Sequence, residues 1–457
     1  MITRPAIVER VREWGLREDV VEKDYVLGWV LWAIGADPEL GDRWVFKGGT
    51  CLKKCYVETY RFSEDLDFTV LPGIEVTEPT VVEALKRVLA RATEESGVDF
   101  AIREPLIRLR PDGTSMEGRV YYRGPRDSPE AASVKIDLSL TEVVVRPPVL
   151  RTISHPYPDT LPGAQTVRCY SFEEVFAEKL RAMGERGRPR DLYDIVNLFW
   201  RPDLRPHGTL VRQTLEEKCR TKGVPVPTMA LLEAAPSREQ LVSEWASMLG
   251  HQLQTLPPFE PFWAELPGLF AWLDGAASPA ELPEIAGDED VDSSWTPPTT
   301  AWTWNIGVPF EAIRFAASNR LCVELGYHGT TRVIEPYSLR RARSGNLLLH
   351  AVRVDSREHR SYSIGQITSV RVTNRSFRPV FRIEFAASGN LSAPPVRRGS
   401  STFSAPRRRP AGIVYIVQCR ICGRTFRRST SSTVLRAHKG QHGYPCRGRY
   451  GRFVGQG

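Results

Sequence analysis

Two aspartates spaced two residues apart, behind a pair of glycines, are the residues of this 457-residue chain that point most directly to chemistry. Gly48, Gly49 and Thr50 come first, and Asp65 and Asp67 follow in the segment SEDLDFTV. Apolar residues alternate with the aspartates there, so a strand would bury one face and direct both carboxylates from the other. Paired carboxylates can hold a divalent metal ion, and glycines admit phosphate close to backbone N–H groups because no Cβ intervenes. The pattern predicts a site for a metal ion and a triphosphate.

A third carboxylate is expected on a neighbouring strand. Residues 132–140, read as ASVKIDLSL, alternate apolar and polar side chains and leave Asp137 on the polar face. We expect Asp137 to join Asp65 and Asp67 in holding two Mg²⁺ ions. One ion would lower the pKa of an attacking hydroxyl, and the other would neutralise a leaving pyrophosphate. A solvated strand residue is the alternative interpretation of Asp137 taken alone.

The order of these features resembles the nucleotidyltransferase superfamily that includes DNA polymerase beta. Either feature alone is common in ordinary turns and solvated strands, so the combination carries the prediction. The resemblance implies catalysis by the carboxylates and nucleotide binding by residues around the glycine turn and a later arginine. The expected nucleotide-binding residues are Gly48, Gly49, Thr50, Lys53, Ser63 and Arg190.

Further motifs narrow the family. They are EKDY at 22–25, FKGGT with SEDLDF, KID at 135–137, and AEKLRA followed by RDLYDI at 190–195. Over about residues 15 to 200 the chain resembles the AbiEii/AbiGii toxin family of nucleotidyltransferases. The resemblance implies the toxin half of a toxin–antitoxin or phage-defence pair, which attaches nucleotides to RNA with tRNA as the best-supported acceptor class. A cognate antitoxin protein would then be a partner.

Lys179 interrupts the apolar stripe of a helix that is predicted to begin near Phe172. At 100° per residue it falls among Val175, Phe176 and Met183. Lysine is rarely buried without a charged partner, so we expect Lys179 to meet a nucleotide phosphate or a carboxylate in the cleft. A side chain that extends to solvent is the alternative.

Two aspartates follow that helix as Asp-x-x-Asp. Asp191 is best explained as a helix N-cap or first-turn carboxylate. The family resemblance makes Asp194 the functional candidate and lets Arg190 contact phosphate. The expected catalytic residues are therefore Asp65, Asp67, Asp137, Lys179 and Asp194.

Length and composition allow two to four domains with ordinary apolar content. We find no apolar run of the roughly 20 residues that a membrane helix needs and no secretory signal, so a cytoplasmic protein without membrane contact is expected. The eight cysteines suggest reduced thiols and local metal sites more than a disulfide framework.

The basic charge is concentrated at the C-terminal end. From Leu391 onward there are 14 Lys and Arg residues and no acidic residue, whereas the rest of the chain carries a net charge of −6. A solvated tail explains the run at residues 407–409. The remaining arginines favour contact with the phosphates of DNA or RNA.

The last forty residues contain the ligand types of a zinc site. Cys419-x2-Cys422-x15-His438-x3-His442 resembles a C2H2 zinc finger whose central loop exceeds the usual twelve residues by three. Two thiolates and two imidazoles would bind a structural Zn²⁺ ion, with the second half of the motif on a helix. Cys446 could replace His442 as the fourth ligand, and the sequence leaves the two alternatives open.

The regions between are predicted from periodicity and composition. Residues 306–390 resemble the WYL domain in Glu335-Pro336-Tyr337 and in the stretch from Arg360 to Ile367, although LLL replaces the tripeptide that names the domain. The fold class is α+β: a polymerase beta-like nucleotidyltransferase core, a helical appendage, a small β-barrel or sheet domain and a zinc finger. The predicted regions are a nucleotidyltransferase domain at 1–200, the appendage at 201–275, a linker at 276–305, the WYL-like domain at 306–390, a basic linker at 391–412 and the zinc-finger-like module at 413–457.

Two functions from different classes follow. The first is an Mg²⁺-dependent transferase that moves a nucleotide from an NTP to RNA. The second is a nucleic-acid-binding regulator or sensor in which the transferase fold has lost turnover. The complete carboxylate set favours the enzyme, and a transferase acting on a small molecule would leave the basic tail unexplained.

Overall fold

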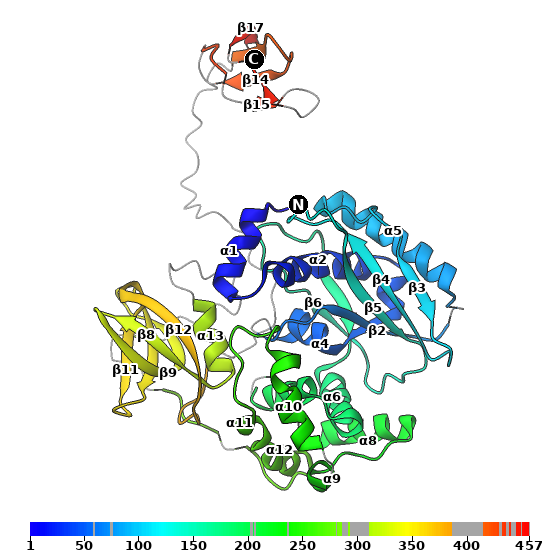
Figure 1. The fold of residues 1–457 in the computed structure, drawn as a ribbon, viewed down its shortest axis with the longest axis vertical. Helices are drawn as coiled ribbons and strands as arrows, with labels where there is room; N and C mark the ends of the chain where they lie inside the picture. Colours follow the sequence, from blue (N-terminus) through cyan, green and yellow to red (C-terminus); the bar gives the residue numbers. More distant parts are fainter. Residues whose placement is uncertain are drawn as a thin grey trace. The chain divides into compact units, whose positions relative to one another are not determined.

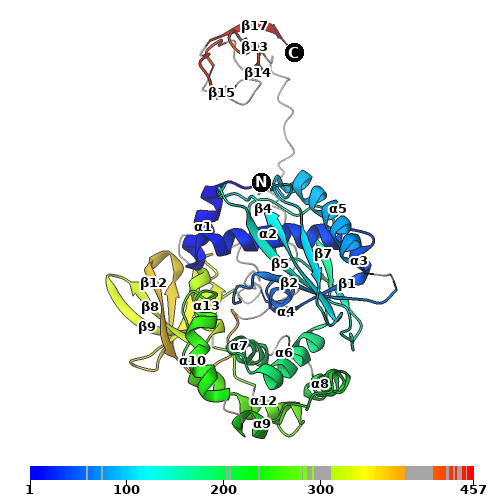
Figure 2. The same ribbon diagram turned by 45° about the vertical axis from the view of Figure 1, so that its right-hand side comes forward.

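The chain forms two compact units, Met1–Pro394 and Pro395–Gly457. The computed structural model in Figures 1 and 2 shows the helices and strands of both. It describes residues 1–57, 60–73, 76–201, 204, 207–234, 237–279, 281–285, 291–292, 310–385, 415–428, 432–435, 438–439, 445–448 and 450–456.

A seven-stranded mixed sheet organises the first unit, in the order β3-β4-β5-β2-β1-β7-β6. The two strands predicted to carry carboxylates are adjacent and parallel, while β1 and β4 flank them in antiparallel pairing. The strands are β1 (Trp44–Lys47), β2 (Asp65–Val70), β3 (Leu106–Leu109), β4 (Ser115–Tyr122), β5 (Ala132–Ser139), β6 (Val149–Thr152) and β7 (Thr166–Cys169).

Helices from the N-terminal segment pack on this sheet. α2 (Glu18–Gly35) contacts β7 and α5 (Glu78–Ser96) contacts β3, and the two helices contact each other (Figure 2). From Tyr25 onward α2 is apolar on all sides, as expected for a helix segment that neighbours cover. α1 (Arg4–Trp14) and α3 (Leu40–Arg43) complete this layer. Among the described residues, no helix combines the length and apolarity that crossing a membrane requires.

The glycine turn begins a short helical segment. α4 (Gly48–Cys51) continues directly into a five-residue π-helix, η1 (Leu52–Tyr56). Cys51 and Cys55 are fully buried there, as packing residues would be. The chain then returns to the sheet as β2, so the glycines and the aspartates lie on neighbouring elements (Figure 1).

A helical layer follows the sheet. α6 (Phe172–Arg186) begins at Ser171, whose hydroxyl accepts a hydrogen bond from the Glu174 N–H, and it ends at Gly187 in the left-handed region. α7 (Pro189–Phe199) comes next, still within the predicted nucleotidyltransferase domain. Helices also occupy the segment predicted as a helical appendage. They are α8 (Gly208–Lys222), α9 (Met229–Ala234), α10 (Ser237–Leu249), α11 (Phe259–Trp263) and α12 (Leu266–Leu273).

The segment predicted as WYL-like forms one antiparallel sheet in the order β11-β10-β9-β8-β12. A barrel would need β11 to pair with β12, and no such pairing occurs among the described residues. A helix absent from the prediction, α13 (Phe310–Ser318), packs on the sheet. The strands are β8 (Leu321–Tyr327), β9 (Thr330–Arg341), β10 (Leu347–Arg353), β11 (His359–Ser363) and β12 (Ile367–Ser376), with a 3-10 turn η3 (Ile364–Gln366).

Part of the predicted linker packs against this sheet. Ile285 is buried with Tyr337 and Phe377, and Asp292 forms an ion pair with Arg341 at 2.5 Å. These described residues therefore belong to the first unit.

The second unit consists of two small sheets. β13 (Tyr415–Cys419) pairs with β14 (Thr425–Arg428) and β17 (Gly451–Gln456), and β15 (His438–Lys439) pairs with β16 (Pro445–Cys446). The predicted histidine helix is wrong at His438, because that residue lies in a strand. His442 and the predicted basic linker at 391–412 lie outside the described residues.

Candidate active site

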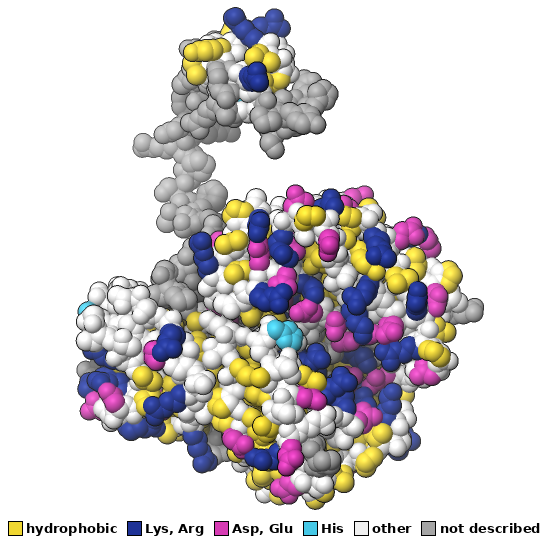
Figure 3. Space-filling view, in the orientation of Figure 1, with side chains coloured by type: hydrophobic (Ala, Val, Ile, Leu, Met, Phe, Trp, Pro, Cys, Tyr) yellow, Lys and Arg dark blue, Asp and Glu magenta, His cyan; other side chains and the backbone are white. Residues whose placement is uncertain are grey.

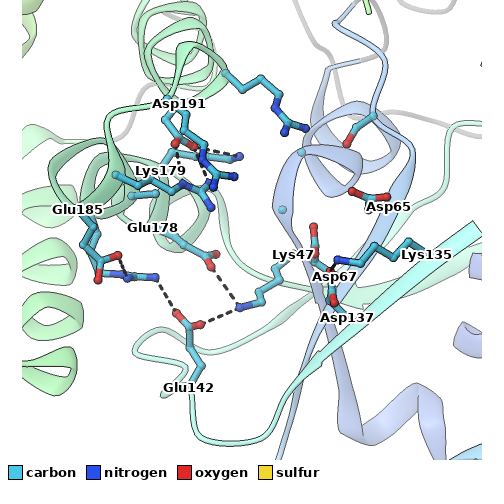
Figure 4. Close-up of a pocket in the computed structure, with 18 of the residues that line it drawn as sticks. Lys47, Asp65, Asp67, Lys135, Asp137, Glu142, Glu178, Lys179, Glu185 and Asp191 are labelled. Carbon is cyan, nitrogen blue, oxygen red and sulfur yellow. Dashed lines mark hydrogen bonds and ion pairs between the residues drawn. The ribbon is translucent and has the colours of Figure 1, made fainter. Parts of the chain in front are cut away.

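A polar cavity of about 610 Å³ lies where β1, β2 and β5 face α6 and α7. Acidic and basic side chains gather around this hollow in Figure 3, and Figure 4 shows them pointing into it. Basic groups outnumber acidic ones in the lining, which favours a polyanionic ligand. The basic lining residues are Lys47, Arg61, Arg110, Lys135, Lys179, Arg181, Arg186, Arg188 and Arg190.

The three predicted carboxylates come together in this cavity. The parallel pairing of β2 and β5 sets Asp67 directly opposite Asp137, with Asp65 two residues along the same strand. All three line the cavity, and Figure 4 shows them close to one another. Lys135, opposite Asp65, forms an ion pair with Asp137 at 2.7 Å.

The electrostatics of the group favour a bound cation. Burial raises the pKa of Asp67 to about 6, repulsion from Asp137 and Asp65 adds to the effect, and Lys47 opposes it. Burial likewise raises the pKa of Asp65, against the attraction of Lys135. Since burial and mutual repulsion disfavour the ionised pair, a divalent ion would relieve both.

The glycine pair makes room for two side chains of the site. Gly48 has φ +78°, and a Cβ there would lie 2.2 Å from Asp67 Oδ2. A Cβ on Gly49 would lie 2.6 Å from Arg61 Nη2. Any larger residue would have to displace the carboxylate or the guanidinium, and at Gly48 the positive φ would add backbone strain.

Thr50 and Ser63 differ in their access to the cavity. Thr50 is buried, and its hydroxyl donates to the backbone carbonyl of Asp65 at 2.5 Å. It thereby ties α4 to β2 and does not line the cavity, unlike the role expected for it. Ser63 lines the cavity beside Gly49.

Lys179 lies in the cleft with a carboxylate partner. Its Nζ is 2.8 Å from Asp194 Oδ2 and 4.0 Å from Asp191 Oδ1, and its side chain is one of those lining the cavity. The two aspartates, both on α7, therefore fix the position of the ammonium group.

Asp194 is fully buried and does not line the cavity. Arg61 donates to both of its oxygens, at 2.6 and 2.7 Å, and the Tyr60 hydroxyl donates at 2.7 Å. Burial opposes ionisation, but Arg61 and Lys179 hold the pKa of Asp194 well below its usual range. The geometry makes Asp194 the anchor of two cationic side chains.

The start of α7 carries two further arginines. Its N-cap is Arg188, so Asp191 is not the cap; it lies in the first turn, where Arg186 donates to both carboxylate oxygens at 2.9 Å. Arg188 and Arg190 line the cavity without an ion-pair partner in the part of the chain that the structure describes. No carboxylate among the described residues is paired with them in competition with a bound anion.

Lys53 does not face the cavity, contrary to the expected nucleotide contact. Its ammonium group lies 4.3 Å from the centre of the Phe62 ring and 5.6 Å from that of Trp14, in a buried position. Lys54 is buried with Asp24, a residue of the EKDY motif, at 2.7 Å. The basic segment after the glycines is therefore part of the core.

Sequence reasoning missed the network around Lys47. Its Nζ lies 2.8 Å from Glu142 and 3.2 Å from Glu178 (Figure 4), and Arg181 also contacts Glu142. The available signal was a lysine that ends an apolar strand directly before the glycine pair. Arg61 was missed as well, because its partner on α7 is more than a hundred residues away.

Comparison with known families agrees with this geometry. A model described as nucleotidyl transferase AbiEii toxin, type IV toxin–antitoxin system, matches residues 29–271, more than half of the chain. The chain belongs to the AbiEii family. It is a nucleotidyltransferase, and membership implies an NTP substrate and a cognate antitoxin; enzymes of this family generally use Mg²⁺.

Other comparisons add less. The solved structure of MenT4, a nucleotidyltransferase toxin from Mycobacterium tuberculosis, is 22% identical, with a TM-score of 0.43 and coverage of 60% of this chain and 90% of that one. No curated protein matches the chain.

Proposed function

We propose that this AbiEii-family enzyme transfers a nucleotidyl group from an NTP to RNA, with tRNA as the acceptor class. The observation that carries the proposal is the register of β2 and β5, which brings Asp65, Asp67 and Asp137 into one cavity beside the glycine pair. In the reaction a hydroxyl oxygen of the acceptor forms a bond to the α-phosphorus, pyrophosphate leaves, and the hydroxyl proton is released.

The three carboxylates fit the oxygen ligands that Mg²⁺ prefers. When bound, Mg²⁺ would polarise the attacking hydroxyl and neutralise the leaving pyrophosphate. Lys135 would release Asp137 from their ion pair as the cation binds, because both compete for the same carboxylate.

The cationic lining would bind the triphosphate. Arg188 and Arg190 line the cavity and would contact phosphate oxygens directly, and Lys179 would add a fixed positive charge. Charge that is held in place before the reaction stabilises developing negative charge without reorganisation. Asp194 would contribute indirectly, as a positioning residue that holds Lys179 and Arg61.

We further propose that the C-terminal unit contacts nucleic acid. Tyr450 and Phe453 are 65% and 49% exposed, and Arg420, Arg447 and Arg452 are exposed as well. Aromatic rings stack on unpaired bases, and arginines contact phosphates. Such a surface suits a single-stranded segment of an RNA acceptor.

The β-domain offers less support for nucleic-acid binding. Arg340 pairs with Glu384, Arg353 with Asp355 and Arg360 with Glu358. These arginines are partly neutralised by their neighbours, which favours ordinary surface ion pairs. The resemblance to WYL domains stays a prediction.

The test is incubation of the purified protein with each α-labelled NTP and total RNA, with and without Mg²⁺. We expect one NTP to label RNA of tRNA size in an Mg²⁺-dependent reaction. RNA whose 3′-terminal diol has been oxidised by periodate should not be labelled if the 3′-hydroxyl attacks. Label that appears only in small molecules, or in no acceptor, would contradict the proposed acceptor.

A further inference from the structure

Four potential metal ligands converge in the C-terminal unit. The ligand atoms of Cys419, Cys422, His438 and Cys446 all lie within 4.8 Å of one another. None of the three cysteines forms a disulfide. Three sulfurs and one imidazole nitrogen form a donor set that selects zinc.

Two measured distances agree with the edges of a zinc tetrahedron. Bond lengths of about 2.3 Å to sulfur and about 2.0 Å to nitrogen place two sulfurs about 3.8 Å apart and a sulfur and a nitrogen about 3.5 Å apart. Cys419 Sγ lies 3.8 Å from Cys446 Sγ, and Cys422 Sγ lies 3.4 Å from His438 Nε2. A tetrahedron with four protein ligands is a closed, structural site.

The first pair of cysteines lies in a tight turn between β13 and β14. Gly423, which follows Cys422, has φ +72°, and its N–H donates to the Cys419 carbonyl at 3.0 Å. The Ile421 N–H points at Cys419 Sγ, 3.5 Å away. Backbone donors of this kind stabilise a thiolate, which is the form that binds metal.

The second pair of ligands comes from β15 and β16. These strands set His438 directly opposite Cys446. The Gly448 N–H donates to Cys446 Sγ at 3.3 Å, and a Cβ at position 448 would lie 2.4 Å from Cys419 Sγ. Glycine at 448 therefore allows the two halves of the cluster to close on one another.

The unit has little else to stabilise it. Among its described residues, the buried apolar side chains other than cysteines are Val417 and Leu435, which pack with Cys419 and Cys446. So small a core cannot offset the conformational entropy of folding, so a metal is needed to hold the sheets together.

A second group of cysteines has three potential ligands, whereas a closed zinc site needs four. Cys51, Cys55 and Cys169 also have sulfurs within 4.8 Å of one another, but no fourth ligand joins them among the described residues. They are fully buried in the large core of the first unit. That group is apolar packing.

We propose that Cys419, Cys422, His438 and Cys446 bind one Zn²⁺ ion in a closed Cys3His site. The fourth ligand is thus Cys446, and the second pair of ligands lies on the paired strands β15 and β16, unlike the helix of a C2H2 finger. This inference does not depend on transferase activity.

The first test is the zinc content of the full-length protein and of two variants. We expect one Zn²⁺ per chain, retained by His442→Ala and lost by Cys446→Ala. Cys219→Ser, at a buried thiol of the first unit, controls for the loss of a cysteine and should retain zinc. Zinc retained by Cys446→Ala, or absent from protein produced with added zinc, overturns the proposal.

The second test needs no variant and remains decisive if both variants lose zinc. Co²⁺ substituted into the full-length protein reports geometry by its visible bands and thiolate number by the intensity of sulfur-to-metal charge transfer. We expect a tetrahedral spectrum with three thiolates. A two-thiolate spectrum would establish the C2H2 alternative and overturn the proposal.

Discussion

The two ligand clusters of this chain are built in opposite ways. The carboxylates of the first unit lie on adjacent strands of a seven-stranded sheet with an extensive apolar core. The cysteines of the second unit are themselves a large part of the core that its described residues form. In the first unit the fold holds the ligands, whereas in the second the proposed metal would hold the fold.

This difference predicts different effects for the removal of each metal. A cation at Asp65, Asp67 and Asp137 would relieve repulsion in a structure that exists without it, so its removal should cost activity. Zn²⁺ at the Cys3His cluster would supply folding free energy, so its removal should cost structure.

Removal of zinc should have the largest effect. Structural zinc supplies on the order of 10 kcal/mol of apparent binding free energy, more than so small a core can replace. A strong chelator should therefore expose residues 415–456 to protease, while the thermal unfolding of the first unit stays unchanged. Limited proteolysis followed by mass spectrometry measures the first effect, and calorimetry of the same sample measures the second. Protection that survives chelation would break the comparison.

The next effect is expected from Asp67→Asn. The substitution keeps the shape of the side chain but removes a metal ligand, and nucleotide transfer should fall at least about 1,000-fold. The unfolding temperature measured without Mg²⁺ should be unchanged or higher, because the lost charge is buried and repelled by its neighbours. Glu94→Gln, at an exposed position of α5, is the control and should retain normal transfer. A variant that unfolds would show that the carboxylate is structural.

Asp194→Asn should destabilise the first unit, in contrast to Asp67→Asn. It removes the carboxylate that neutralises Arg61 and Lys179, both of which are buried. Loss of one partner from a buried ionic cluster typically costs about 3–5 kcal/mol. Urea unfolding of the two variants side by side measures the contrast. Equal stability of Asp194→Asn and the unmodified protein would rule out the anchoring role.

Lys179→Met separates charge from packing within the same cluster. Arg61 still donates to both oxygens of Asp194, so the free energy of unfolding should fall by only about 1–2 kcal/mol. Transfer should fall about 100-fold, the scale typical of losing one fixed electrostatic group. Single-turnover rates at saturating NTP give the measurement. Near-normal turnover would leave phosphate binding to Arg188, Arg190 and the Gly48–Gly49 backbone.

The smallest expected effect is on the free energy of unfolding at acid pH. Burial opposes ionisation of Glu142, but Lys47, Lys218 and Arg181 outweigh it and lower its pKa to about 2. A carboxyl group with a depressed pKa stabilises the fold above its unfolded pKa of about 4.3, and this contribution disappears as the pH falls through the folded pKa. Glu142→Gln should therefore be less stable than the unmodified protein by about 1–2 kcal/mol at pH 6. The gap should close between pH 4.5 and 2, as measured by denaturant midpoints; a constant gap would refute the assignment.

Local patterns in the sequence were enough to place the carboxylates. Alternation with period two directs Asp65, Asp67 and Asp137 from the polar faces of their strands, because successive side chains point to opposite sides. The need for glycine at 48 also follows from short-range geometry, since Asp67 of the aspartate strand packs directly against that turn. Residues close in the chain largely determine both features.

Tertiary structure decided which charged groups share the cavity. Lys53 turns into the core because the turn after α4 is π-helical, which changes the set of side chains on each face, whereas Lys47 reaches Glu142 and Glu178. Arg61 forms an ion pair with Asp194, and Cys446 lies beside Cys419. The partners in each pair are far apart in the chain, so no local sequence pattern predicts these contacts. The sequence by itself determined the residue types and the strand faces. Burial and pairing between distant segments decided the partners, because ion pairs and metal coordination need atoms within a few ångströms of one another, and only the folded chain brings them that close.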